Sequence, residues 1–115
     1  MIYEKNIAMV AHEANRAYCA ALGDNSQLPW DEAPEWQRQS ALAGVMAIKA
    51  DPSRTPEQSH EGWLEHKRLD GWKYGKVKNP ELKEHPCFVP YHELPADQQV
   101  KDRLFTSVVK ALLGV

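Results

Sequence analysis

Apolar residues recur at helical spacing in three long segments of the chain. In the first, residues 4–22, one face carries apolar residues at these positions: Ile7, Val10, Ala14, Ala17, Tyr18 and Ala21. The second and third segments, residues 34–50 and 95–113, repeat the same spacing of three to four residues. This period is that of an amphipathic helix with one face toward a core. The pattern therefore predicts three long helices.

The ends of a fourth helix are marked more clearly than its apolar face. Residues 55–58 read Thr-Pro-Glu-Gln, which is a capping box with proline in the first turn. Gly71 follows the expected end of this helix at about residue 70, where a glycine can close it. The segment has few aliphatic residues, so we expect Trp63 to attach it to the rest of the domain.

The helical period is lost between residues 71 and 94. Residues 72–75 (WKYG) and 87–91 (CFVPY) are typical of short extended segments, and Pro90 favours an edge position for the second of them. We expect the two to pair as a small antiparallel ribbon. The predicted fold is therefore mainly α, with four helices and a short antiparallel β ribbon in one domain.

Composition and charge limit the class of protein. A chain of 115 residues corresponds to one domain. The net charge is −2 and no basic stripe is present, so we expect no polymeric nucleic acid as a partner. No apolar run approaches the ~20 residues that span a bilayer, and the start MIYEKN lacks the apolar core of a signal peptide. We therefore expect a cytoplasmic protein that does not enter the membrane, with both cysteines free.

A set of landmarks in the second half of the chain resembles the RyR domain, the repeat first recognised in ryanodine receptor calcium channels. The landmarks, in order, are Trp63, Gly71-Trp72, Tyr74-Gly75, His85-Pro86, Pro90-Tyr91 and Leu94-Pro95. The core of the resemblance runs from about residue 57 to residue 113, and residues 1–115 as a whole are similar to stand-alone bacterial and phage members. The resemblance implies a compact helical unit with short antiparallel strands. It also implies one of two roles: a protein-interaction domain, as in the channels, or a sensor of nucleotide-derived ligands, as proposed for bacterial members.

A polar stripe on the first predicted helix is the first candidate site. His12, Asn15, Arg16 and Cys19 lie at i, i+3, i+4 and i+7, opposite the predicted apolar face. One interpretation is a plain solvated surface. The other is the wall of a ligand cleft, in which the guanidinium of Arg16 would contact a phosphate.

The aromatic residues near the ribbon are the second candidate site. Trp72 and Tyr74 are two residues apart, so in an extended segment they share one face. Both rings could pack on the helices below. Alternatively, at least one could line a cleft and stack on a planar base, an interaction worth roughly 1–3 kcal/mol.

The third candidate is a face of the fourth predicted helix. His60, Trp63 and Lys67 lie at i, i+3 and i+7, and Lys67 could be a second phosphate contact or part of a solvated surface. No His-x-x-x-His or Cys-x-x-Cys pair occurs, so we expect no metal. The chain has no glycine-rich phosphate loop and no G-x-S-x-G motif, so we expect neither catalysis nor a cofactor.

Together these patterns predict a non-catalytic binding module for a small nucleotide-derived ligand. The cleft would lie between the first helix and the ribbon. The candidate lining residues are His12, Asn15, Arg16, Trp30, Trp63, Lys67, Trp72 and Tyr74. The alternative is a protein-interaction domain without a small-molecule ligand, with self-association as one form of it.

Overall fold

The computed structural model describes residues 3–115 and contains the four predicted helices. Its elements are α1 (Glu4–Ala21), the 3₁₀ turn η1 (Trp30–Glu32), α2 (Glu35–Ala50), α3 (Pro56–Leu69), β1 (Lys73–Tyr74), β2 (Glu84–His85), the 3₁₀ turn η2 (Tyr91–Glu93) and α4 (Ala96–Leu113). The helix bounds differ from the predicted ones by at most one residue. None of these helices has the length and apolar character needed to cross a bilayer.

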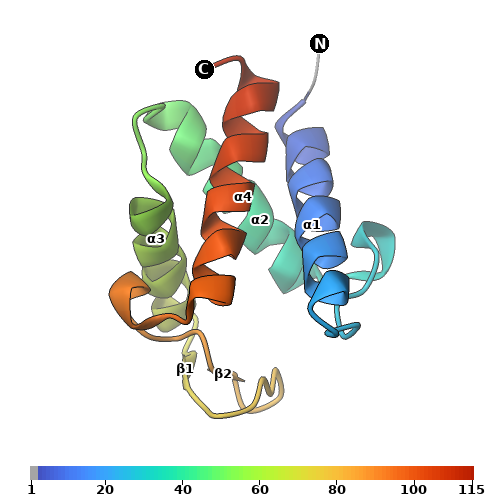
Figure 1. Ribbon diagram of the computed structural model, residues 1–115, viewed down its shortest axis with the longest axis vertical. Coiled ribbons are helices and arrows are strands. Elements are labelled where there is room, and N and C mark those ends of the chain that lie inside the picture. The colour runs from blue at the N-terminus through green and yellow to red at the C-terminus, as the bar shows by residue number, and fades with distance from the viewer. Residues whose placement is uncertain (1–2) are drawn as a thin grey trace.

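Three of the helices enclose the hydrophobic core. Figure 1 shows α1 and α4 side by side and running in opposite directions, with α2 behind them and both termini at the same end. The buried core residues come from these three helices alone: Ile7, Ala8, Ala11, Val45, Ile48 and Val109. The side chains of Phe105 and Leu112 pack against this cluster from α4.

The predicted apolar face of α1 is only partly correct. Ile7 is buried as predicted, but Val10 is 42% exposed, and Ala8 and Ala11 are fully buried instead. Small side chains allow α1 to approach its neighbours closely, and this places the alanine side of the helix in the core. The same rotation buries His12 and Cys19, which the predicted face left toward solvent.

Helix α3 stands beside α2 and α4 but adds no residue to the core cluster among the described residues. Its N-terminal capping box is confirmed: Gln58 N–H donates to Thr55 Oγ1 and Thr55 N–H donates to Gln58 Oε1. The two residues that α3 buries are polar, His60 and Lys67. This helix therefore has a polar interior face.

The predicted antiparallel ribbon is also wrong, because β1 pairs with β2 in parallel and not with residues 87–91. Lys73 lies opposite Glu84 and Tyr74 opposite His85. Before β2 the chain makes a tight hairpin, in which Asn79 and Glu84 form an antiparallel bridge. This additional reversal turns β2 to run in the same direction as β1. Residues 87–90 follow without regular secondary structure, and Tyr91 begins η2.

Candidate ligand-binding cavity

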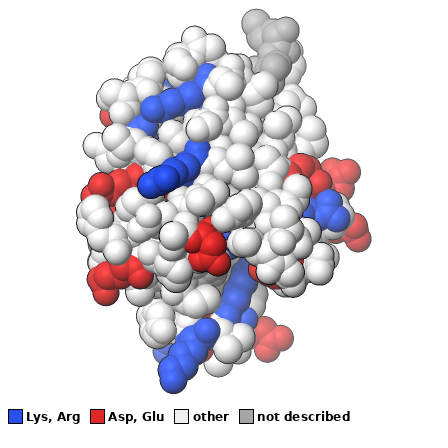
Figure 2. Space-filling model, in the orientation of Figure 1, with Lys and Arg blue, Asp and Glu red and all other residues white. Residues whose placement is uncertain are grey.

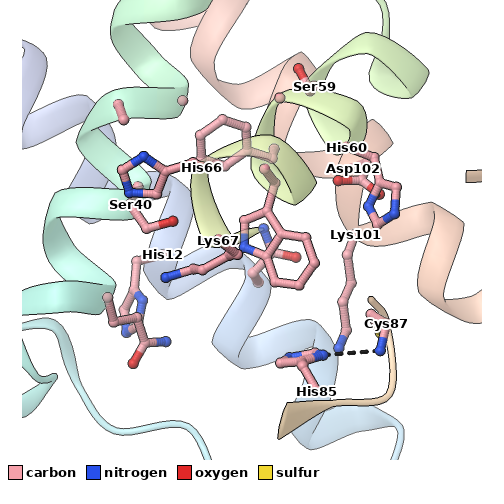
Figure 3. A pocket seen from close by; sticks show the side chains of 18 of the residues that line it. His12, Ser40, Ser59, His60, His66, Lys67, His85, Cys87, Lys101 and Asp102 are labelled. Carbon is pink, nitrogen blue, oxygen red and sulfur yellow. Dashed lines mark hydrogen bonds and ion pairs between the residues drawn. The ribbon is translucent and has the colours of Figure 1, made fainter. Parts of the chain in front are cut away.

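A cavity of about 410 Å³ lies between α3 and the rest of the domain. All four helices and the segment around the ribbon contribute to its wall (Figure 3). The aromatic part of the wall comprises Trp36, Trp63, Trp72 and Phe105. The basic part comprises Arg54, Lys67, Lys78 and Lys101. The volume is in the range of small-molecule sites, which are ~300–1,000 Å³.

Lys67 is the most unusual residue in this wall. It is only 3% exposed, yet its ammonium makes no hydrogen bond or ion pair with any residue from 3 to 115. Its Nζ atom lies 4.4 Å from the ring centroid of Trp36 and 5.3 Å from that of Trp72. Burial lowers the pKa of Lys67 to about 8, because desolvation disfavours the charged form. The two rings partly stabilise the ammonium by cation–π attraction.

The end of α3 holds Trp72 against Lys67. Gly71 adopts a left-handed conformation with φ of 89°, which reverses the chain after the helix. Trp72 N–H then donates to Lys67 O at 3.0 Å, and Gly71 N–H donates to Arg68 O at 3.0 Å. These two bonds form the Schellman motif, which requires a residue such as glycine that tolerates positive φ. The sequence Gly71-Trp72 therefore sets the aromatic wall beside the buried amine.

His60 is fixed by two partners. Its Nε2 atom lies 2.7 Å from Val89 O, so Nε2 is protonated and donates a hydrogen bond to this carbonyl. Its Nδ1 atom lies 3.5 Å from Asp102 Oδ2. Desolvation raises the pKa of Asp102 to about 6, and attraction to His60 opposes that rise. The pair links α3 to α4 at the edge of the cavity.

His85 is a neutral imidazole at the ribbon end of the cavity. Cys87 N–H donates to its Nδ1 atom at 3.0 Å, so that nitrogen is unprotonated (Figure 3). Burial, followed by repulsion from Lys78 and Lys101, lowers the pKa of His85 to about 4. The nearby lysines therefore act on His85 as an uncompensated positive field.

The basic residues of the wall differ from those of the outer surface. None of the four makes an ion pair within residues 3–115, whereas six of the other ten lysines and arginines do. The wall contains one acid, Asp102. Desolvation and repulsion from Lys101 lower the pKa of Lys78, although Lys78 is exposed to solvent. On the face shown in Figure 2, acidic and basic side chains are intermixed. The positive character therefore belongs to the cavity.

Two buried oxygen atoms of the wall have no hydrogen-bond partner within the described part of the chain. They are Asn15 Oδ1 on α1 and Ser59 Oγ on α3. Most buried polar atoms in folded proteins are hydrogen-bonded, so each unpartnered one calls for an explanation. A ligand that donates to the Asn15 oxygen and accepts from the Ser59 hydroxyl would satisfy both groups.

The structure brings together five of the eight residues predicted for the site. His12, Asn15, Trp63, Lys67 and Trp72 line the cavity. His12 also donates from Nε2 to Leu28 O at 2.7 Å, because that carbonyl can only accept. This bond fixes the loop between α1 and η1 to the helix.

The other three predicted residues lie outside the cavity wall. Arg16 pairs with Glu13 at 2.9 Å on the outer side of α1. Trp30 contacts the His12 ring edge-on, at 5.6 Å between centroids. Tyr74 is 53% exposed, while Trp72 is buried, so the two do not share one environment. Of the two aromatic residues predicted for the ribbon side of the cleft, only Trp72 lines the cavity.

Sequence patterns missed the residues that reach the cavity from α2 and α4. Trp36, Lys101 and Asp102 lie on helices whose periodicity indicated only a core face. Trp36 was detectable as the single aromatic residue of α2, Glu35–Ala50. Nothing in the local sequence around Lys101 distinguishes it from a surface lysine.

The fold and cavity define a small helical domain with a polar interior site. The chain belongs to the RyR domain family, because the sequence profile of that family matches residues 49–115, more than half of the chain. The match contains α3, the ribbon and α4, and with them Trp63, Lys67 and Trp72. Helix α1 and most of α2, which supply His12, Asn15 and Trp36, precede it. Among residues 3–115, no group of three or more metal-ligating side chains is gathered in one place.

Proposed function

We propose that the chain is a non-catalytic binding module that senses or sequesters a small nucleotide-derived anion in this cavity. The observation that carries the proposal is the buried ammonium of Lys67, which faces the cavity and makes no ion pair within the described residues. Asp70 attracts this ammonium from beyond ion-pair distance and pairs instead with Lys83. A buried charge without a partner is costly, so its retention favours a role in binding. An anionic group beside Lys67 would supply the missing charge.

The aromatic wall supports a ligand with a planar ring. Trp63 lies beside His60 and His85, with centroid distances of 5.6 Å and 5.1 Å. Across the cavity, α2 contributes the small residues Ala43 and Gly44. A base stacked on Trp63 would gain roughly 1–3 kcal/mol. The free oxygen of Asn15 would then accept a hydrogen bond from an amino or hydroxyl group of the ligand.

A thermal-shift screen of the purified chain tests the proposal. The panel contains mononucleotides, cyclic nucleotides, dinucleotide cofactors and ADP-ribose variants. A ligand at 100 times its Kd stabilises the folded state by about 2.7 kcal/mol, which is a shift of several degrees in a domain of this size. The shift is expected to vanish in Lys67→Met and to persist in Lys76→Met, which removes an exposed lysine outside the cavity.

A screen without any saturable shift, on protein shown to be folded by NMR, would contradict the proposal. Arg16→Ala sharpens the test, because Arg16 was predicted to contact the anion but lies outside the wall. We expect that substitution to leave ligand binding unchanged.

A second candidate function, a protein-interaction domain, is supported by exposed apolar side chains near the ribbon. Leu69 is 78% exposed, Val77 74% and Leu82 62%. Solvent-exposed apolar groups clustered in one segment are typical of contact surfaces. Sedimentation of the wild type and of Val77→Asp tests this function in its self-associating form. A monomer at all concentrations contradicts that form.

A further inference from the structure

Arg54 enters the cavity wall by lying across a glycine of α3. Gly62 is in the interior of that helix, where glycine is less favourable than alanine. A Cβ atom at this position would collide with Nη2 of Arg54. The glycine therefore leaves room for the guanidinium to lie against the helix and reach the cavity.

The guanidinium keeps most of its hydrogen-bonding capacity free. Its Nη2 atom donates to Gln58 O at 3.0 Å, and it makes no ion pair with a carboxylate anywhere in residues 3–115. A guanidinium has five N–H donors, in an arrangement that matches phosphate and carboxylate. Ser59 directly follows Gln58 in the sequence, and its buried Oγ atom has no hydrogen-bond partner among the described residues.

Ser59 lies at the opposite end of the cavity from His85. Figure 3 shows Ser59 at one end of the view and His85 at the other, with Lys67 between them. Along α3, Ser59 is eight residues from Lys67, and Gly62, which the Arg54 guanidinium covers, is five residues from it. These separations are about 12 Å and about 8 Å along the helix axis. The cavity therefore has two separate cationic groups, Lys67 on α3 and Arg54 lying against the same helix.

We propose that Arg54 and Ser59 form a second anion subsite, so that the ligand of this cavity carries two anionic groups about 8–12 Å apart along α3. This inference rests on the proposed function for its first subsite, at Lys67. One anionic group binds Lys67. The other accepts hydrogen bonds from the guanidinium of Arg54 and from the hydroxyl of Ser59. The middle of the ligand lies along Trp63. A mononucleotide would occupy only one of the two subsites.

Calorimetric titration with simple phosphates tests the distance directly. The probes are α,ω-alkanediol bisphosphates of increasing spacer length, each compared with the matching alkyl monophosphate. We expect the bisphosphates whose phosphates reach about 8–12 Å apart to bind at least tenfold more tightly than the matching monophosphates, since the second contact becomes intramolecular. Shorter bisphosphates should show no such gain.

Two substitutions remove the second subsite in different ways. Arg54→Gln deletes the guanidinium, and Gly62→Ala displaces it while placing a better helix former in α3. Both are expected to lose the tenfold gain and to retain monophosphate binding, with Gly62→Ala melting no lower than the wild type. Arg103→Gln, which removes an exposed arginine outside the wall, is the matched control and should keep the gain.

The possible failures separate the two proposals. Monophosphate binding that depends on Lys67 but shows no dependence on spacer length overturns the second subsite alone. A spacer-dependent gain that survives Arg54→Gln also overturns it. The absence of any phosphate or nucleotide binding to the folded wild type overturns both the anion site at Lys67 and the subsite at Arg54.

Discussion

The domain has two interiors of opposite character. Between α1, α2 and α4, side chains such as Val45, Ile48 and Val109 are fully buried and wholly apolar. Between α3 and the rest, the buried groups include the imidazole of His60 and the ammonium of Lys67, which lie beside the rings of Tyr91 and Trp72. The first interior follows the ordinary rule that apolar groups leave water. The second interior departs from this rule, and departures of this kind concentrate at functional sites.

The two interiors also use different interactions to hold their helices. Apolar burial holds α1, α2 and α4 together. In α3, a capping box and a Schellman motif fix the two ends of the helix, and polar contacts of His60 with Val89 and Asp102 link it to the rest of the domain. Stability and ligand recognition are therefore assigned to different parts of the fold, and substitutions in the two interiors should have effects of different sign.

The largest effect is expected in the apolar interior. Ile48→Ala removes a fully buried side chain that is packed against α1 and α4, and should lower the free energy of unfolding by ~2–5 kcal/mol. Urea unfolding followed by circular dichroism measures the loss. A loss below about 1 kcal/mol would mean that the core relaxes to fill the space left by the Ile48 side chain, and therefore that it is not closely packed.

Trp63→Ala provides the contrast for Ile48→Ala. A fully buried tryptophan costs ~3–5 kcal/mol when truncated to alanine. Trp63 is only half-buried and faces the cavity, so its loss should fall below that range. If Trp63→Ala proves more costly than Ile48→Ala in the same assay, the α3 side is a second structural core and the comparison fails.

In the polar interior the expected sign is reversed. The lowering of the pKa of Lys67 to about 8 corresponds to a cost of ~3 kcal/mol for keeping its ammonium charged in the folded state. Cation–π attraction to the two tryptophans offsets a part of this cost. Lys67→Met should therefore raise the stability of the ligand-free domain at pH 7 by ~1–3 kcal/mol. Chemical unfolding measures the gain, and Lys76→Met serves as the control without effect.

The pH dependence of stability in the wild type and in Lys67→Met tests whether desolvation of the Lys67 ammonium is the cause. The folded-state pKa of Lys67 is about 8 and its ordinary value is 10.5, so between these pH values the unfolded chain binds more protons. The wild type should gain stability relative to Lys67→Met as the pH rises from 8 to 10.5. Below pH 8 their difference should be constant. A difference that stays constant up to pH 10.5 would show that Lys67 is not desolvated.

The apolar interior could largely be predicted from the sequence, because local periodicity determines which segments are helices. The rotation of α1 could not, since alanines line several of its sides and the alanine pair Ala8 and Ala11 has too little hydrophobic contrast to mark the buried face. The direction of β2 also depended on one hairpin, Asn79–Glu84, whose backbone bridge has no strong sequence signal.

The polar interior could be predicted only where one helix carries the pattern. His60, Trp63 and Lys67 share a helical period, and all three line the cavity. Lys101 and Trp36 come from other helices, and their approach to α3 depends on tertiary packing. Arg16 was selected for its charge, but Glu13 lies one turn away and pairs with it.

The smallest effect on stability is expected at the N-terminus of α3, which borders the polar interior. Thr55→Ala removes the side chain that caps α3, including the bond from Gln58 N–H at 3.1 Å, and should lower stability by about 1 kcal/mol. Thr55→Ser retains the hydroxyl and should lose little. Because Lys67 and Trp72 are positioned by the other end of α3, monophosphate affinity measured by calorimetry should not change in either variant. A loss of affinity that parallels the loss of stability would show instead that α3 responds as one unit, so that its fold and its binding site cannot be separated.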